Sequence, residues 1–141
     1  MINFFQEDVS IKVPTPLKTK RWLKAVVEAE GAQLNHLNYI FCSDEYLLNV
    51  NREYLEHDYY TDIITFDTSD EGEDQIEGDI FVSIDRVKEN AQNLTKSFED
   101  EFRRVLVHGV LHLIGYDDTT DESEAEMRKK EDDYLQIFKE L

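Results

Sequence analysis

Two histidines, His108 and His112, lie four residues apart in the stretch HGVLHLIGYDD, residues 108–118. On an α-helix this spacing puts both imidazoles on one face, about one turn apart, so that they can bind a single ion. Gly115 can end such a helix in a left-handed turn, after which the chain can bring Asp118 back toward the histidines. Two nitrogens and one carboxylate oxygen are a frequent ligand set of catalytic zinc sites, in which a fourth position stays open.

The histidine pair also has a simpler interpretation. A His-x-x-x-His pair alone is more often two hydrogen-bonded core histidines than a metal site. From Val105 to Ile114, however, every residue except the two histidines is apolar or glycine, which predicts a helix buried nearly all round. A buried imidazole without a partner costs about 1–3 kcal/mol, and the aspartate after the helix favours a metal as that partner. Gly109 stands where His-Glu-x-x-His peptidases carry their glutamate, so a peptidase is disfavoured.

The composition predicts one domain, residues 1–141, without a membrane role. Fifteen basic residues against 32 acidic ones give a formal net charge of -17, which opposes undirected binding to nucleic acids and anionic membranes. No apolar stretch approaches the roughly 20 residues of a transmembrane helix. The single cysteine, Cys42, has no internal disulfide partner, and the first residues lack the basic and apolar pattern of a secretory signal. We therefore expect a cytoplasmic location.

The hydrophobic pattern alternates between strand and helix periods, which predicts an α+β fold. The helix 44–58 is expected to begin at an Asp44 cap, and the acidic stretch 69–78 is expected to connect two strands that pair as a hairpin. The result is a small mixed sheet of about four strands flanked by helices, with a metal cleft on the central helix. The expected strands are 2–8, 34–43, 61–68 and 77–84, and the expected helices are 16–31, 44–58, 83–94, 97–115 and 121–141.

The histidine stretch resembles the signature of the YbeY family of metal-dependent bacterial endoribonucleases, His-Gly-x-Leu-His-Leu-x-Gly-Tyr-Asp-His, at every position except the last. Two blocks upstream follow the family order. NREYLEHDYYTDIITF, residues 51–66, is similar to Asn-x-x-Tyr-Arg and Thr-Asp-Val-Leu-Ser-Phe, and EGDIFVSIDRVKENA, residues 77–91, is similar to the family's Gly-Asp-Ile segment and following helix. The resemblance implies one zinc ion in a cleft and a single-strand-specific endoribonuclease that acts in late 16S ribosomal RNA maturation and ribosome quality control.

The resemblance also implies that His108, His112 and Asp118 bind the zinc. The family has a histidine at the third position, whereas Asp118 brings a negative charge that lowers the Lewis acidity of the ion. Metal binding is expected to survive this change, and activity to be weaker. Asp117 matches the family motif and is expected to orient a ligand or cap the turn, although exchanged roles for the two aspartates stay open.

Three further positions concern the cleft and the substrate. Thr61 and Asp62 open a strand in a shared block and are expected beside the cleft, although a strand-forming threonine and a turn aspartate would also fit the pattern. Leu55 stands where the family has an arginine that suits a phosphate. Arg52 or His57 would be the nearest replacement, but each is also typical of an ordinary surface.

Contact with RNA needs local positive charge despite the overall charge. The candidates are residues 18–24 and Arg103 with Arg104, which are equally typical of solvated helix faces. The expected partners are ribosomal RNA and ribosomal particles or ribosomal proteins. Two alternatives stay open at this point: a metal-dependent hydrolase of a non-RNA substrate, and a non-catalytic ribosome assembly factor in which the ion only stabilises the end of the helix.

Overall fold

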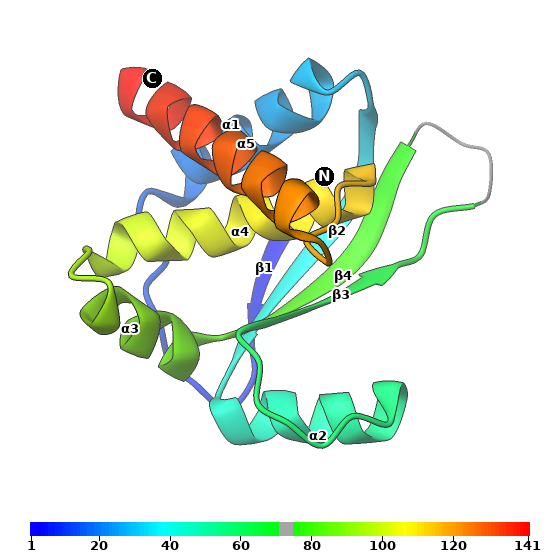
Figure 1. Cartoon of the computed structure of the whole chain (residues 1–141), viewed down its shortest axis with the longest axis vertical. Helices are drawn as coiled ribbons and strands as arrows, with labels where there is room; N and C mark the ends of the chain where they lie inside the picture. Colours follow the sequence, from blue (N-terminus) through cyan, green and yellow to red (C-terminus); the bar gives the residue numbers. More distant parts are fainter. Residues whose placement is uncertain (71–74) are drawn as a thin grey trace.

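The computed structural model describes residues 1–70 and 75–141 (Figure 1). The predicted α+β fold is confirmed, with a four-stranded mixed sheet and helices on both faces. The elements in chain order are β1 (Ile2–Gln6), α1 (Pro16–Ala29), β2 (Gln33–Cys42), α2 (Asp44–Leu55), β3 (Ile63–Asp67), β4 (Gln75–Ser83), α3 (Ile84–Asn93), α4 (Phe98–Ile114) and α5 (Asp121–Glu140).

The strands lie in the order β1-β2-β4-β3. β1, β2 and β4 are parallel, whereas β3 runs antiparallel to β4 and forms the predicted hairpin with it. β4 begins at Gln75, inside the stretch 69–78 that we expected to be only a connection, because Gln75 and Ile76 pair with the start of β2 and Ile76 is buried. The remainder of that expectation falls partly on residues 71–74, which lie outside the described residues.

Helices cover the two faces of the sheet unequally. α1 and α4 pack against one face, and α5 lies on their outer side (Figure 1). The main hydrophobic core fills this space and includes Trp22, Phe41, Leu106 and Phe138. α2 packs on the opposite face over a smaller cluster around Leu47. None of the described helices is both long and apolar enough to cross a membrane.

The central helix α4 is defined by clear end signals. The Ser97 hydroxyl accepts a hydrogen bond from the Asp100 N–H, and acidic residues occupy the first turn, where they favour the helix dipole. The predicted left-handed turn at Gly115 is confirmed by its φ of 128°. Between these ends the helix is buried along most of its length, and the Tyr39 hydroxyl donates to the Leu106 carbonyl at 2.8 Å. α4 is therefore held rigidly against the sheet.

The cap of α2 differs from the sequence prediction. The residue before the helix is Ser43, whose hydroxyl accepts from the Tyr46 N–H at 3.1 Å. Asp44 is the first helical residue, and its carboxylate accepts instead from the Ser83 hydroxyl at 2.9 Å and from Arg86 at 2.8 Å. The aspartate was the wrong choice of cap because a tertiary contact with the start of α3 uses its oxygens.

Two glycines allow the close approach of neighbouring elements. A Cβ atom added at Gly109 of α4 would lie 3.0 Å from the Cδ1 atoms of both Ile63 and Ile80. A Cβ atom added at Gly78 of β4 would lie 2.6 Å from the Phe66 carbonyl oxygen. Flexible side-chain ends can yield to an extra methyl group, whereas a strand carbonyl cannot move without its strand.

Gly78→Ala is therefore expected to lower the free energy of unfolding by about 1–3 kcal/mol. Gly109→Ala is the matched control, because the atoms nearest to its methyl group are isoleucine side-chain carbons and alanine gains about 1 kcal/mol of helix propensity over glycine. Urea unfolding followed by circular dichroism measures both variants. Equal losses of stability in the two proteins would contradict this account of the packing.

Candidate metal centre

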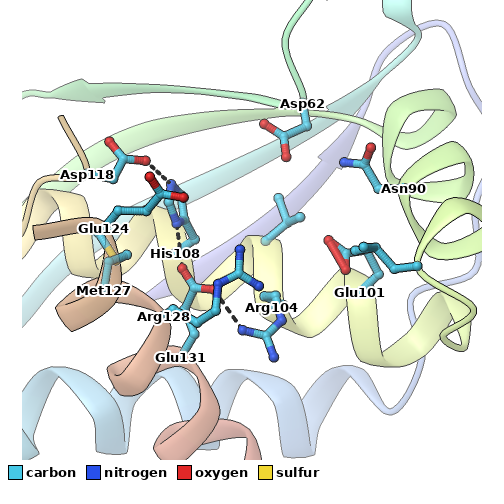
Figure 2. Close-up of a pocket in the computed structure, with 12 residues that line it drawn as sticks. Asp62, Asn90, Glu101, Arg104, His108, Asp118, Glu124, Met127, Arg128 and Glu131 are labelled. Atoms are coloured by element: carbon cyan, nitrogen blue, oxygen red, sulfur yellow. Dashed lines mark hydrogen bonds and ion pairs between the residues drawn. The ribbon is translucent and has the colours of Figure 1, made fainter. Parts of the chain in front are cut away.

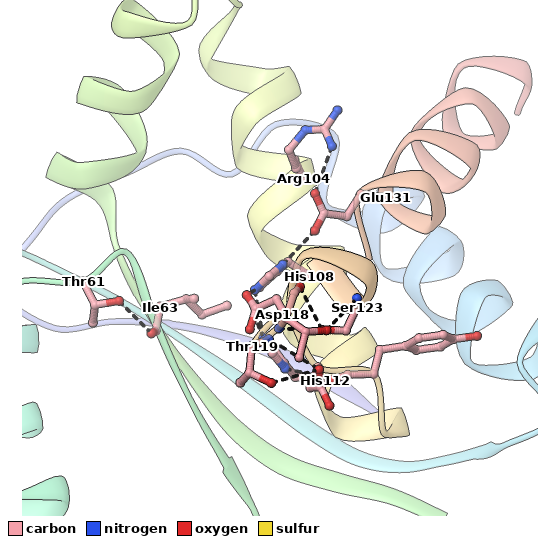
Figure 3. A network of polar contacts seen from close by, with 12 residues as sticks. Thr61, Ile63, Arg104, His108, His112, Asp118, Thr119, Ser123 and Glu131 are labelled. Carbon is pink, nitrogen blue, oxygen red and sulfur yellow. Dashed lines mark hydrogen bonds and ion pairs between the residues drawn. The ribbon is translucent and has the colours of Figure 1, made fainter. Parts of the chain in front are cut away.

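Three potential ligand atoms converge at the C-terminal end of α4 (Figure 3). The Nε2 atoms of His108 and His112 are 2.9 Å apart. Asp118 Oδ2 lies 3.5 Å from His108 Nε2 and 3.7 Å from His112 Nε2. Ligands about 2.1 Å from a tetrahedral zinc ion are about 3.4 Å from one another. The three residues predicted as ligands are thus close enough to bind one ion together.

The turn after α4 brings Asp118 to the histidines. The N–H groups of Gly115 and Tyr116 both donate to the Leu111 carbonyl, at 3.1 and 3.0 Å. Gly115 adopts the positive φ that this reversal needs, which a residue with a Cβ atom would adopt only with strain. The helix stop is therefore part of the site, because it sets the direction in which the next residues leave the helix.

Each histidine ring is oriented through its second nitrogen. His108 Nδ1 lies 2.7 Å from Glu131 Oε2, and His112 Nδ1 lies 3.0 Å from the Tyr116 carbonyl oxygen. A carbonyl and an ionised carboxylate only accept hydrogen bonds, so we assign a hydrogen to each Nδ1. The neutral rings then present two Nε2 lone pairs to each other, beside the Asp118 carboxylate. Only a cation between them, a metal ion or a proton, relieves this repulsion, so the donor set fits a metal.

Charges around the pair favour a cation at this place. Burial alone would lower the pKa of His108, but the hydrogen bond and charge of Glu131, together with Asp118, raise it above its ordinary value. Burial and the charge of His108 lower the pKa of His112. Burial would raise the pKa of Glu131, yet hydrogen bonds from His108 and Arg104 hold it below its ordinary value. Glu131 is therefore an anion behind the first histidine.

Glu131 is the site residue that the sequence analysis missed. Its side chain is buried, with 5% of the residue exposed, and it also accepts from Arg104 Nη1 at 2.9 Å. Along α5 it shares one face with the buried residues Met127, Tyr134 and Phe138. A glutamate on the apolar face of an amphipathic helix was the available signal, because a buried carboxylate needs a partner.

A cleft of about 410 Å³ opens beside the metal centre, bounded by α3, α4, α5 and the segment just before β3 (Figure 2). His108 and Asp118 line it, and Asp62 faces them from the strand side. Burial raises the pKa of Asp62. Thr61 is not among the residues that line the cleft in the described part of the chain, and its hydroxyl donates to the Ile63 carbonyl at 3.4 Å.

Asp117 lies at the exposed turn between α4 and α5. Its Oδ1 atom accepts from both the N–H and the hydroxyl of Thr119, each at 3.4 Å. Within the described residues it makes no hydrogen bond to either histidine. A hydrogen bond from Ser123 is the main reason that the pKa of Asp117 lies below its ordinary value. The contacts of this aspartate are those of a turn residue.

Several basic residues considered for RNA contact are engaged within the protein. Arg104 reaches the cleft but pairs with Glu131 and, through Nη2, with Asp132 at 2.5 Å. The Arg103 guanidinium lies over the Phe138 ring, 4.1 Å from its centroid. The described residues that line the cleft do not include Leu55 or Arg52, which are exposed at the end of α2, or the nearby His57.

Comparisons with known proteins agree with this arrangement. A family model described as Endoribonuclease YbeY matches residues 1–139. The chain belongs to the YbeY family. It is 52% identical to the Endoribonuclease YbeY of Cytophaga hutchinsonii, over 98% of this chain and 96% of that relative. The Flavobacterium psychrophilum protein of the same name is 44% identical, over 98% of this chain and 96% of its own length.

A solved structure supports the fold. The solution structure of a Thermotoga maritima protein superposes with a TM-score of 0.71 at 31% sequence identity, covering 98% of this chain and 89% of that one. The resemblance drawn from three short motifs is therefore confirmed over nearly the whole chain.

Glu131→Gln is expected to lower the affinity for Zn²⁺ by about 10–100-fold, because the neutral amide withdraws the anion that orients His108 and raises its basicity. Competition with a chromophoric chelator measures this affinity. Asp132→Asn is the matched control, since Asp132 binds the same arginine without touching a histidine. An unchanged affinity in Glu131→Gln, or an equal loss in both variants, would show that Glu131 does not act through His108.

Proposed function

We propose that this endoribonuclease is zinc-dependent and cleaves single-stranded RNA, with a role in late 16S ribosomal RNA maturation and in ribosome quality control. The observation that carries the proposal is the convergence of His108, His112 and Asp118 at a cleft, in a chain of the YbeY family. Family membership favours this function over a hydrolase of another substrate and over a non-catalytic assembly factor.

Zinc is the metal that the donor set suits best. Two imidazole nitrogens and one carboxylate oxygen leave a fourth position open, as in catalytic zinc sites. Zinc bound by these residues supplies a Lewis acid for the phosphodiester group. Glu131 and the Tyr116 carbonyl keep both Nε2 atoms directed at the same point, so the rings need only move slightly apart from their 2.9 Å separation when the ion binds.

The cleft supports a single-stranded substrate. Its volume of about 410 Å³ suits an unpaired nucleotide and is too small for a double helix. Leu94, Val105 and Met127 supply apolar surface against which a base can pack, and Asp62 and Asn90 supply polar groups. An unpaired strand can therefore bring one phosphodiester to the metal centre while its base occupies the cleft.

The acidic character of the chain bears on its partners. The protein has a formal net charge of -17, which repels long stretches of RNA. Contact with RNA is therefore confined to the cleft. We propose that ribosomal particles or ribosomal proteins position the RNA. The single cysteine, Cys42, is free and buried, which is compatible with the proposed cytoplasmic location. A single domain over residues 1–141 is part of the same proposal.

Zinc-reconstituted wild-type protein is expected to cleave single-stranded ribosomal RNA, and His112→Ala, purified in the same way, is expected to lose the activity because it removes one ligand. A chelator is expected to abolish wild-type cleavage, and added zinc to restore it. Gel analysis of the RNA measures both. Equal cleavage by the two proteins would indicate a contaminating nuclease, and no cleavage by wild-type protein with bound zinc would contradict the proposed mechanism.

Asp118→His is expected to retain zinc and to cleave RNA faster, by up to roughly tenfold, because a neutral imidazole offsets less of the cation's charge than a carboxylate does. Asp118→Asn controls for loss of charge with a poorer ligand and is expected to bind zinc more weakly. Single-turnover cleavage rates, together with the zinc content of each protein, separate the two effects. A slower Asp118→His protein with full zinc content would contradict this view of Asp118.

A further inference from the structure

Two guanidinium groups line the cleft, and they differ in their engagement. Arg104 is held by ion pairs with Glu131 and Asp132, and its side chain is only 12% exposed. Arg128, on the next helix, lines the same cleft and is exposed. Among residues 1–70 and 75–141, Arg128 has no ion pair or side-chain hydrogen bond. It is thus the arginine of the cleft whose donors are available to a ligand.

The position of Arg128 follows from α5. Glu124, Arg128 and Glu131 recur at helical spacing, and all three line the cleft. Glu131 binds His108, so Arg128 lies within one helical turn of a residue that contacts the metal centre. Figure 2 shows the Arg128 side chain directed from α5 into the cleft. A group bound at the metal centre therefore lies in the same cleft as this guanidinium.

The charge of the cleft makes this arginine significant. Its walls carry five carboxylates, from Asp62, Glu101, Asp118, Glu124 and Glu131. A phosphodiester that enters such a cleft meets repulsion unless a cation faces it, and Arg104 is already neutralised by its own partners. A guanidinium presents paired N–H donors that match two phosphate oxygens, and it keeps its charge at any physiological pH.

We propose that Arg128 binds the backbone phosphate of the RNA strand at the metal centre. This inference rests on the proposed function and assigns to α5 a second task besides the support of His108. Glu131 orients a metal ligand on one side, and Arg128 holds the substrate phosphate on the other. The arginine is a binding residue for the anionic backbone, so it recognises RNA without regard to sequence.

The test compares Arg128→Gln with Lys129→Gln, which removes the same charge from the next exposed residue of α5, outside this cleft. Binding of a fluorescent single-stranded RNA oligonucleotide is followed by anisotropy over a range of salt concentrations, in chelator to prevent cleavage. Arg128→Gln is expected to bind roughly tenfold more weakly. Its log-affinity against log-salt slope is expected to fall by about 0.7, the value for one lost phosphate contact. Lys129→Gln is expected to stay within about twofold of wild type.

Arg128→Lys separates charge from geometry, because lysine keeps the charge without the paired donors, and it is expected to restore part of the affinity. Equal losses in Arg128→Gln and Lys129→Gln would overturn the inference, since overall charge would then explain both. Wild-type protein that binds and cleaves RNA, with Arg128→Gln unchanged, would overturn the inference and leave the proposed function standing. Wild-type protein that neither binds nor cleaves RNA would overturn the proposed function itself.

Discussion

The close approach of two imidazole nitrogens is the interaction that the rest of the site has to maintain. Nε2 of His108 and Nε2 of His112 are 2.9 Å apart, with a carboxylate oxygen beside them. Such an arrangement is unfavourable unless a cation occupies it, and a mobile side chain would simply rotate away. Both rings are prevented from rotating because their Nδ1 atoms are engaged and because α4 is packed against the sheet. The fold thus holds two lone pairs and a carboxylate oxygen in positions that a bound cation stabilises.

The residues that maintain this geometry come from distant parts of the chain. The Tyr116 carbonyl that orients His112 belongs to a residue whose hydroxyl donates to Glu30, at the end of α1, at 2.5 Å. Glu30 also accepts from Tyr134 and, at 3.2 Å, from Lys130, both on α5. Burial would raise the pKa of Glu30, but these hydrogen bonds hold it below its ordinary value. One carboxylate therefore joins α1, α5 and the turn after α4.

Local signals explain what could be predicted from the sequence. The spacing of His108 and His112, the glycine stop and the aspartate that follows all act within about ten residues, so pattern alone indicated the three potential ligands. Glu131 was missed because its role depends on the packing of α5 against α4, which no local pattern encodes. Arg104 was similarly expected to face RNA or solvent, whereas tertiary packing supplies it with two carboxylates. The predicted Asp44 cap failed for the same reason, since its partner comes from α3.

The dependence of His108 on Glu131 determines when, during synthesis of the chain, the site can form. Translation produces α4 before α5, so the emerging chain contains both histidines and Asp118 while Glu131 is still to be added. During that interval His108 lacks the carboxylate that fixes its orientation. The ribosome that makes this nuclease itself consists largely of RNA. Because of the order of synthesis, the site is complete only after α5 has left the ribosome and packed against α4.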